Sequence, residues 1–285
     1  MSTTGQPAQA TGRRSVTVVT GVAGLIGGRI AEVLTERGVD VVGVDVVAPP
    51  RSAPAAWIEV QADLTDERAV RGVATSVRAE HGGIDAVVHA AALTGRSPDL
   101  GTHTLRSVDL DLWRRVIEVN LTGALLCIRE FGALLRPEPL GQILVVGSVQ
   151  GLVPTMGASA YAVSKAALTG LVRQFAAEFA PEGIGVNLVA PGPVADAGEV
   201  QRLREQGLHE APTPMGAYLS PRDMAEAICD LLTGSFGFMT GAVIPIDGGE
   251  HLRPRTGPSR AHDGASHDGA SHDGASHDGA SHDDA

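Results

Sequence analysis

Short runs of apolar residues, rich in valine and isoleucine, alternate with longer segments of helical periodicity along most of this chain. The runs are largely continuous, which is typical of strands buried on both faces, and crossover helices between such strands produce a parallel sheet. The predicted strands span residues 15–20, 39–45, 57–60, 84–89, 142–146, 185–189 and 242–246, and the predicted helices span residues 25–37, 66–80, 110–135, 159–180 and 221–232. The fold class is therefore α/β, with a doubly wound parallel sheet of about seven strands in a single domain.

The predicted elements place this domain between residues 13 and 252, after a small, polar segment (residues 1–12) that we expect to be flexible. From His262 the sequence His-Asp-Gly-Ala-Ser repeats four times and contains no apolar side chain larger than alanine. A segment that buries so little apolar surface does not fold, so residues 253–285 are predicted to be a disordered tail. We expect this tail to have no chemical role and predict no metal site. The alternative is that its histidines and aspartates chelate a transition metal weakly.

Composition argues against several classes of protein. The net charge is −11, and six aspartates of the tail leave −5 for the rest of the chain, whereas a nucleic-acid surface needs a basic face. No apolar stretch approaches the roughly 20 residues that span a bilayer, and residues 1–12 have no apolar signal-peptide core. We therefore expect a cytoplasmic protein with no nucleic-acid or membrane partner. Cys127 and Cys229 fall in helical segments and are predicted to be buried thiols.

A glycine-rich segment, Thr20-Gly-Val-Ala-Gly-Leu-Ile-Gly27, joins the first predicted strand to the first predicted helix. Glycine there permits a tight turn and lets the backbone approach a pyrophosphate, which the N-terminus of the helix attracts. Asp45 ends the second strand, where its carboxylate is placed to bind the adenosine ribose and to repel a 2′-phosphate. Asp63 follows the third strand and is placed to reach the adenine edge; for both aspartates, capping of a turn is the alternative. The predicted Rossmann-type NAD site includes Gly21, Gly24, Leu25, Ile26, Gly27, Asp45, Asp63 and Leu64.

Tyr161 and Lys165 lie four residues apart and therefore share one face of a predicted helix. A free phenol has a pKa of about 10, too high for a good proton acceptor at neutral pH, and a neighbouring ammonium lowers that pKa. Ser148 lies thirteen residues before Tyr161 at the end of a predicted strand, where its hydroxyl is placed to bind the oxygen of an alcohol or ketone. Such a pair alone is common on exposed helices. Together with the glycine segment, it predicts proton transfer at a carbinol oxygen while a hydride leaves the carbon.

From about Ser15 to Gly249 the order of these motifs resembles the compact, single-domain branch of the short-chain dehydrogenase/reductase (SDR) family. The resemblance implies that Tyr161 is the catalytic acid or base, that Lys165 lowers its pKa and holds the nicotinamide ribose, and that Ser148 polarises the carbonyl. It implies that Asn120 supports a water-linked proton relay, and that residues 191–192 and 247–249 are the nicotinamide-side loop and the C-terminal signature. Further implied cofactor residues are Ala90, Ala91, Asn120, Tyr161, Lys165, Pro191, Gly192 and Val194, and the implied substrate residues are Ser148, Gln150 and Tyr161.

Three features depart from the compact branch. The glycine spacing (21, 24 and 27) and the segment His89-Ala-Ala-Ala92 resemble the extended branch, which modifies sugar nucleotides. Asp196 stands where a threonine often contacts the nicotinamide carboxamide. The chain lacks the larger C-terminal substrate domain of extended members, so we keep the compact assignment and interpret His89 as a packing residue at a strand end.

The resulting prediction is an NAD-dependent oxidoreductase that acts on a secondary alcohol or its ketone without a metal. The alternatives are a sugar-nucleotide epimerase or dehydratase with tightly held NAD, and a catalytically silent NAD-sensing protein. The resemblance also implies a homodimer or homotetramer. We expect residues 93–107, 149–156 and 194–218 to form the substrate pocket, and their charged side chains slightly favour a polar or anionic substrate.

Overall fold

The computed structural model describes residues 13–48, 57–94, 103–136, 141–207, 211, 213–234 and 236–252. In this part of the chain, seven strands form one parallel sheet in the order β3-β2-β1-β4-β5-β6-β7. The strands are β1 (Val16–Thr20), β2 (Asp40–Asp45), β3 (Trp57–Gln61), β4 (Ala86–His89), β5 (Gln142–Val146), β6 (Gly185–Pro191) and β7 (Val243–Ile246). The predicted doubly wound parallel sheet is confirmed. The predictions for residues 1–12 and 253–285 fall outside the described residues.

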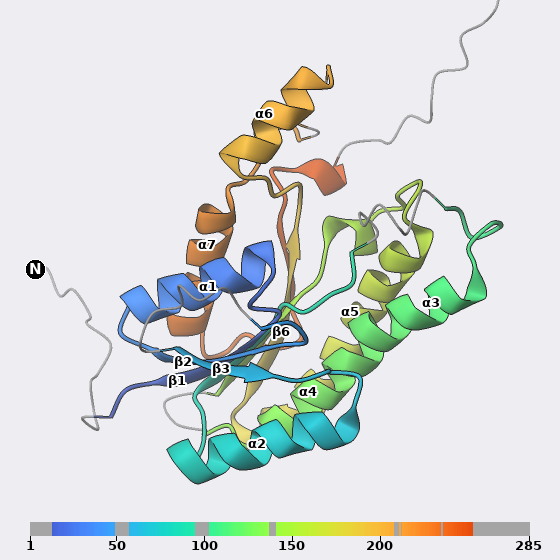
Figure 1. Cartoon of the computed structure of the whole chain (residues 1–285). Coiled ribbons are helices and arrows are strands. Elements are labelled where there is room, and N and C mark those ends of the chain that lie inside the picture. Colours follow the sequence, from blue (N-terminus) through green and yellow to red (C-terminus); the bar gives the residue numbers. More distant parts are fainter. Residues whose placement is uncertain are drawn as a thin grey trace, which may run out of the picture. The chain divides into compact units, whose positions relative to one another are not determined.

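Helices cover both faces of the sheet (Figure 1). On one face lie α1 (Leu25–Glu36) and α7 (Pro221–Thr233), and on the other lie α2 (Glu67–His81), α4 (Gly123–Gly132) and α5 (Ser159–Phe179). Successive strand residues point to opposite faces, so Val18 and Val87 pack in the core under α2, α4 and α5, whereas Val19 and Val88 pack under α1 and α7. This two-sided burial explains the continuous apolar runs.

The strand order reverses between β1 and β4, whose ends Thr20 and His89 are register partners. In open α/β sheets, ligands bind beyond the carboxyl ends of the strands at such a switch point. The glycine segment follows β1, and the segment that begins at Ala90 follows β4. Because β1 and β4 are neighbours, these two segments lie side by side, and the fold brings the predicted cofactor residues that they carry together.

The segment predicted as one helix over residues 110–135 is not a continuous α-helix. It consists of α3 (Leu110–Ile117), a π-helical turn (Glu118–Thr122) and α4, and the backbone N–H of Gly123 donates to the carbonyl of Glu118. Such a turn contains one residue more than an α-helical turn and therefore changes which side chains face the sheet. Asn120 lies in the middle of this turn.

The structure contains a further helix, α6 (Ala197–Glu205), within the segment that we expected to be only a pocket wall. Asp196 caps it, because its carboxylate accepts a hydrogen bond of 2.8 Å from the backbone N–H of Glu199. Figure 1 shows α6 apart from the two helical layers. The remaining short elements are 3-10 helices at Val149–Gly151, Ala180–Glu182 and Glu250–Leu252.

Cys127 and Cys229 are buried free thiols, as predicted. Burial raises the pKa of both thiols, that of Cys229 to about 12, so neither is a thiolate at neutral pH. Among the helices of the described residues, none combines the length and the apolar character that a membrane span requires.

Candidate active site

The glycine segment at the end of β1 is packed too tightly for side chains. Gly21 has a φ of +74°, and a Cβ atom there would lie 2.6 Å from the backbone nitrogen of Ala91. A Cβ atom on Gly27 would collide with the carbonyl oxygen of Gly21. Gly24 is the N-cap of α1 and offers no side-chain acceptor to the first turn of that helix. The N-terminus of α1 is therefore an exposed set of donors that fits the phosphates of a dinucleotide.

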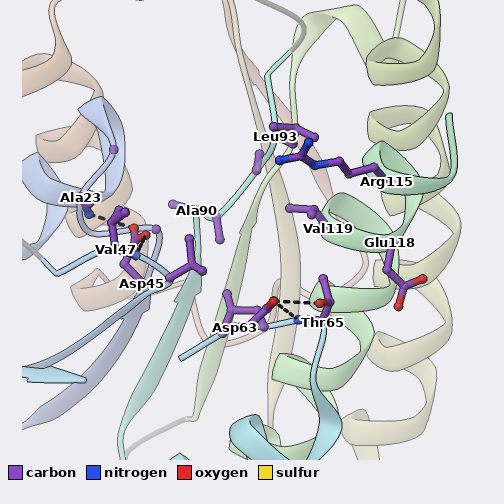
Figure 2. Close-up of a pocket in the computed structure, with 16 residues that line it drawn as sticks. Ala23, Asp45, Val47, Asp63, Thr65, Ala90, Leu93, Arg115, Glu118 and Val119 are labelled. Carbon is purple, nitrogen blue, oxygen red and sulfur yellow. Dashed lines mark hydrogen bonds between the residues drawn. The ribbon is translucent and has the colours of Figure 1, made fainter. Parts of the chain in front are cut away.

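Asp45 fastens this segment to the end of β2. Its Oδ2 accepts a hydrogen bond of 3.0 Å from the backbone N–H of Ala23, and its Oδ1 accepts one of 3.2 Å from that of Val47 (Figure 2). The capping alternative for Asp45 is thus present in the structure. Since each carboxylate oxygen accepts two hydrogen bonds, the residue also retains capacity for ligand hydroxyls.

A cavity of about 590 Å³ opens beside Asp45 (Figure 2). It is lined by residues of the glycine segment, of the segments at the ends of β2, β3 and β4, of α3 and of the π-helical turn that follows α3. These residues are Gly21, Ala23, Gly24, Asp45, Val46, Val47, Asp63, Leu64, Thr65, Ala90, Ala91, Ala92, Leu93, Arg115, Glu118 and Val119. Seven predicted cofactor residues are among them, namely Gly21, Gly24, Asp45, Asp63, Leu64, Ala90 and Ala91. Asp63 also caps a turn there, since its Oδ1 accepts hydrogen bonds from the N–H and hydroxyl of Thr65.

Asn120 connects three parts of the site. Its Oδ1 accepts a hydrogen bond of 2.7 Å from the backbone N–H of Leu93, and its Nδ2 donates to the carbonyl of Leu93 at 3.2 Å. The same Nδ2 donates to the hydroxyl of Ser164 at 2.9 Å, and that hydroxyl donates to the carbonyl of Tyr161 at 2.7 Å. The amide therefore joins the π-helical turn to the segment after β4 and to α5. The sequence analysis missed Leu93 and Ser164 in this role.

Lys165 is buried next to Tyr161 on α5. Its Nζ lies 5.6 Å from the centroid of the Tyr161 ring and donates a hydrogen bond of 2.8 Å to the carbonyl of Val146, at the end of β5. Burial lowers the pKa of Lys165 to about 8. The predicted pairing of these two side chains along one face of a helix is present in the structure.

Ser148 follows β5 by two residues and is the N-cap of the 3-10 helix Val149–Gly151. Its hydroxyl accepts a hydrogen bond of 3.1 Å from the backbone N–H of Gln150. Gly151 packs against α5 so closely that a Cβ atom there would lie 2.7 Å from the carbonyl carbon of Lys165. The turn that carries Ser148 therefore lies against the part of α5 that carries Lys165.

The loop after β6 packs against the turn that follows β7, at residues 247–251. The backbone N–H of Gly192 donates to the carbonyl of Ile246, and a Cβ atom on Gly192 would lie 2.6 Å from the Cα of Asp247. Asp247 accepts hydrogen bonds from the backbone N–H and the ring Nδ1 of His251, at 2.8 and 2.7 Å. Burial acts to raise the pKa of Asp247, but these hydrogen bonds outweigh it and hold that pKa below its usual value. Residues 191 and 192 thus pack against a turn that is held by hydrogen bonds.

His89 is buried at the end of β4, and its Nδ1 lies 3.0 Å from the hydroxyl of Thr20. Burial, assisted by the charge of Lys165, lowers the pKa of His89 to about 3, so its ring is neutral at physiological pH. The hydroxyl of Thr20 also accepts a hydrogen bond from the backbone N–H of Ala91. These contacts support the interpretation of His89 as a packing residue.

The polar and charged side chains of the expected substrate pocket have different environments. His103 is buried, and its Nε2 accepts a hydrogen bond of 3.4 Å from the backbone N–H of Ala160, in the first turn of α5. Arg202 pairs with Glu199 along α6 at 2.6 Å. Arg106 and Arg204 are exposed and make no ion pair within the described part of the chain. Arg96 lies outside the described residues.

Comparison with known proteins identifies relatives of this chain. Residues 21–251 match the family model described as enoyl-(acyl carrier protein) reductase. The chain is 37% identical over 243 residues to cis-4-hydroxycyclohexanecarboxylate dehydrogenase of Sinomonas cyclohexanicum, covering 82% of this chain and 95% of that protein. It is 33% identical over 202 residues to the inactive 2-(S)-hydroxypropyl-CoM dehydrogenase 2 of Xanthobacter autotrophicus, covering 68% and 85%.

Among solved structures, aldohexose dehydrogenase of Thermoplasma acidophilum in its ligand-free form superposes with a TM-score of 0.75 at 26% identity, covering 86% of this chain and 97% of that one. The fold is a Rossmann-type doubly wound sheet with a cavity at its switch point, and the relatives named above are dehydrogenases. More narrowly, the chain belongs to the short-chain dehydrogenase/reductase family, whose members use nicotinamide cofactors.

Proposed function

We propose that this protein is an NAD-dependent dehydrogenase that interconverts a secondary alcohol and its ketone, with Ser148, Tyr161 and Lys165 as the catalytic residues. The observation that carries this proposal is the buried ammonium of Lys165, 5.6 Å from the centroid of the Tyr161 ring. A cation at that position favours the phenolate over the phenol and makes Tyr161 a better proton acceptor. Bound NAD supplies the acceptor for the hydride.

Tyr161, Ser148 and Asn120 have different roles in this reaction. In the oxidation, the Oη of Tyr161 accepts the proton of the substrate hydroxyl, and in the reduction it returns a proton to the same oxygen. The hydroxyl of Ser148 donates a hydrogen bond to that oxygen and stabilises the charge that develops on it. Asn120 acts through the backbone of Leu93 and the hydroxyl of Ser164, so we assign it a positioning role alongside the proton relay that the family resemblance implies.

We assign NAD rather than NADP because of Asp45. Its carboxylate lines the cavity at the end of β2, where the adenosine ribose of a dinucleotide lies in this fold. Leu25, Ile26 and Gly27 would meet the phosphates at the start of α1, and Pro191, Gly192 and Val194 would flank the nicotinamide. Leu64 and Val119 give the adenine an apolar surface in the same cavity.

We further propose that the substrate is a secondary alcohol that carries an anionic group. The relative from Sinomonas cyclohexanicum is named for a ring alcohol with a carboxylate, and the exposed Arg106 and Arg204 provide cations without acidic partners in the described part of the pocket walls. Gln150 follows Ser148 in the same turn, and we expect its amide to contact the polar end of such a substrate.

The test is turnover of cis-4-hydroxycyclohexanecarboxylate and of cyclohexanol with NAD, followed by NADH absorbance. We expect turnover of both and a higher kcat/KM for the carboxylate. Equal kcat/KM values would contradict the anionic preference, and no turnover of any member of a wider alcohol and ketone panel would contradict the dehydrogenase assignment.

Two other functions have specific support. The glycine spacing and His89 favour an epimerase or dehydratase, which would retain NAD through purification and turn over a sugar nucleotide with no net change in NADH. The inactive relative from Xanthobacter autotrophicus favours a silent NAD-binding protein, which would bind NAD(H) and turn over nothing. The presence of Ser148, Tyr161 and Lys165 together supports the dehydrogenase.

We also propose a cytoplasmic homodimer or homotetramer. Leu125 on α4 and Val163 on α5 are apolar and exposed, which suits the helices through which the family assembles. Light scattering at several protein concentrations tests this, and a monomer at every concentration would contradict it.

A further inference from the structure

Arg115 has an unusual environment for an arginine. It lines the cavity together with three acidic residues, Asp45, Asp63 and Glu118, and it is the one cation among the described residues of the lining. Within the described part of the chain its guanidinium makes no ion pair and no hydrogen bond. Its neighbour Arg114, by contrast, pairs with Asp111 at 2.8 Å.

The side chain of Arg115 is directed into the cavity. Figure 2 shows it extending from α3 towards Leu93, on the wall opposite Ala23 and Asp45, whereas the side chain of Glu118 points away. Arg115 on α3 and Val119 in the π-helical turn that follows both line the cavity. Glu118 also accepts a hydrogen bond from the hydroxyl of Thr122.

The wall that carries Arg115 is held in place by contacts already described. The two hydrogen bonds between Asn120 and the backbone of Leu93 fix the distance between the helix and the segment after β4. Arg115 lies on α3, directly before the π-helical turn, and its side chain is exposed, so a ligand in the cavity can reach the guanidinium. The guanidinium therefore faces a ligand site rather than open solvent alone.

A cation would strengthen the binding of a diphosphate, and the described residues of the opposite wall include none. The glycine segment, residues 20–27, contains no lysine or arginine, so its backbone N–H groups and the start of α1 are all that it offers to a diphosphate. The acidic side chains of the cavity repel the same group. An arginine binds phosphate through two parallel N–H donors and retains its charge at any physiological pH.

We propose that Arg115 binds the diphosphate of the bound dinucleotide from the α3 wall and completes a site whose other side is the glycine segment. The inference rests on the proposed NAD function, because it needs a ligand with a diphosphate between the adenosine and the second ribose. It assigns to Arg115 a role in cofactor affinity and none in proton transfer.

The test compares Arg115→Gln with the matched control Arg114→Gln, which alters the adjacent, ion-paired arginine on the same helix. NADH binding is titrated by its fluorescence, and ADP, 2′,5′-ADP and adenosine are measured by displacement of NADH. We expect Arg115→Gln to weaken NADH and ADP about tenfold or more, to leave adenosine unchanged, and to lose this difference in high salt. Arg115→Lys should retain part of the affinity, and Arg114→Gln should bind every ligand like the parent protein.

Each other outcome overturns the assignment. An equal loss for adenosine would mean that Arg115 only supports the cavity wall, and a loss confined to 2′,5′-ADP would assign it to a 2′-phosphate. Unchanged ADP affinity would show that the side chain remains in solvent. Failure of the proposed function is distinguished from these outcomes, because a protein that binds ADP through Arg115 but oxidises no alcohol would contradict the dehydrogenase assignment alone.

Discussion

The ammonium of Lys165 lies 5.6 Å from the centre of the Tyr161 ring, and both side chains belong to consecutive turns of α5. The same ammonium donates to the carbonyl of Val146, so the end of β5 fixes the lysine in position beneath the tyrosine. The relationship gives the tyrosine a fixed neighbouring charge, and two predictions follow from that charge.

We expect Tyr161→Phe to abolish turnover and to leave NADH affinity nearly unchanged, because the substitution removes the proton carrier and retains the ring. General acid–base groups contribute about 10²–10⁴-fold to the rate. The measurement is single-turnover hydride transfer, together with a fluorescence titration of NADH. Tyr218→Phe alters the only other tyrosine of the chain, which belongs to the expected substrate pocket, so it should change KM at most and retain single-turnover hydride transfer. A loss of less than tenfold in Tyr161→Phe would contradict the assignment.

Lys165 should make the stability of the protein depend on pH. Burial lowers its pKa from 10.5 to about 8, so between these values the unfolded chain binds more protons than the folded one. The free energy of unfolding therefore rises with pH across this window, and the cost of burying the charge is largest below pH 8. Relative to Lys165→Met, the parent protein should gain up to about 3 kcal/mol between pH 7 and pH 10.5.

This prediction is checked by urea unfolding of both proteins without cofactor at pH 7, 9 and 10. The matched comparison cancels the titration of all other groups that the two proteins share. A difference in unfolding free energy that is independent of pH would show that the lysine is not charged and buried in the folded protein.

Two glycines with similar backbone conformations should respond differently to alanine. Gly21 and Gly38 have φ angles of +74° and +80°, so both substitutions strain the backbone by about 1–2 kcal/mol. Only at Gly21 would the new Cβ atom meet the backbone of Ala91, whereas nothing lies within 4 Å of one at Gly38. We expect Gly21→Ala to lose NADH binding and to melt at a lower temperature than Gly38→Ala, which should bind NADH normally. Equal NADH affinity in the two variants would contradict the crowded loop.

Much of the fold could be predicted because its determinants are local. Each strand carries its own apolar run, so its bounds were found within two residues. Helix α6 was missed because it buries no residue and therefore has no apolar face to detect. The spacing of Asp196 and Glu199, an N-cap followed three residues later by an acid, was the available signal. The π-helical turn was missed because its residues retain ordinary helical propensity.

The sequence motifs predicted which residues form the candidate site but not the contacts that hold them. Asn120 was identified, but its partners Leu93 and Ser164 lie 27 and 44 residues away, and a contact over that distance depends on how the helices pack. The direction of the Arg115 side chain depends in the same way on the helix packing. Sequence patterns identify which residues carry chemistry, whereas the supporting contacts become visible only in three dimensions.

The last prediction concerns the choice between NAD and NADP. Asp45 lines the cavity where the adenosine ribose should lie, and its carboxylate repels a 2′-phosphate. Arg13 does not offset this repulsion, because its guanidinium forms an ion pair of 2.7 Å with Asp85. Asp85 also accepts a hydrogen bond from the backbone N–H of Val16, so the pair lies at the start of β1, whereas Asp45 lies at the end of β2. We expect NAD to be preferred by at least tenfold in kcat/KM, which corresponds to about 1.4 kcal/mol.

Two variants test the physical basis of this preference. Asp45→Ala should narrow it by removing the repulsion, and Val46→Arg should reverse it, since Val46 is exposed on the same cavity wall and an arginine there would bind the 2′-phosphate. The measurement is kcat/KM for both cofactors on the parent protein and on each variant. A preference of the parent protein for NADP would show that a cation reaches the 2′-phosphate. Arg115 would then be the first candidate, because it lines the same cavity as Asp45 and is the one cation among the described lining residues.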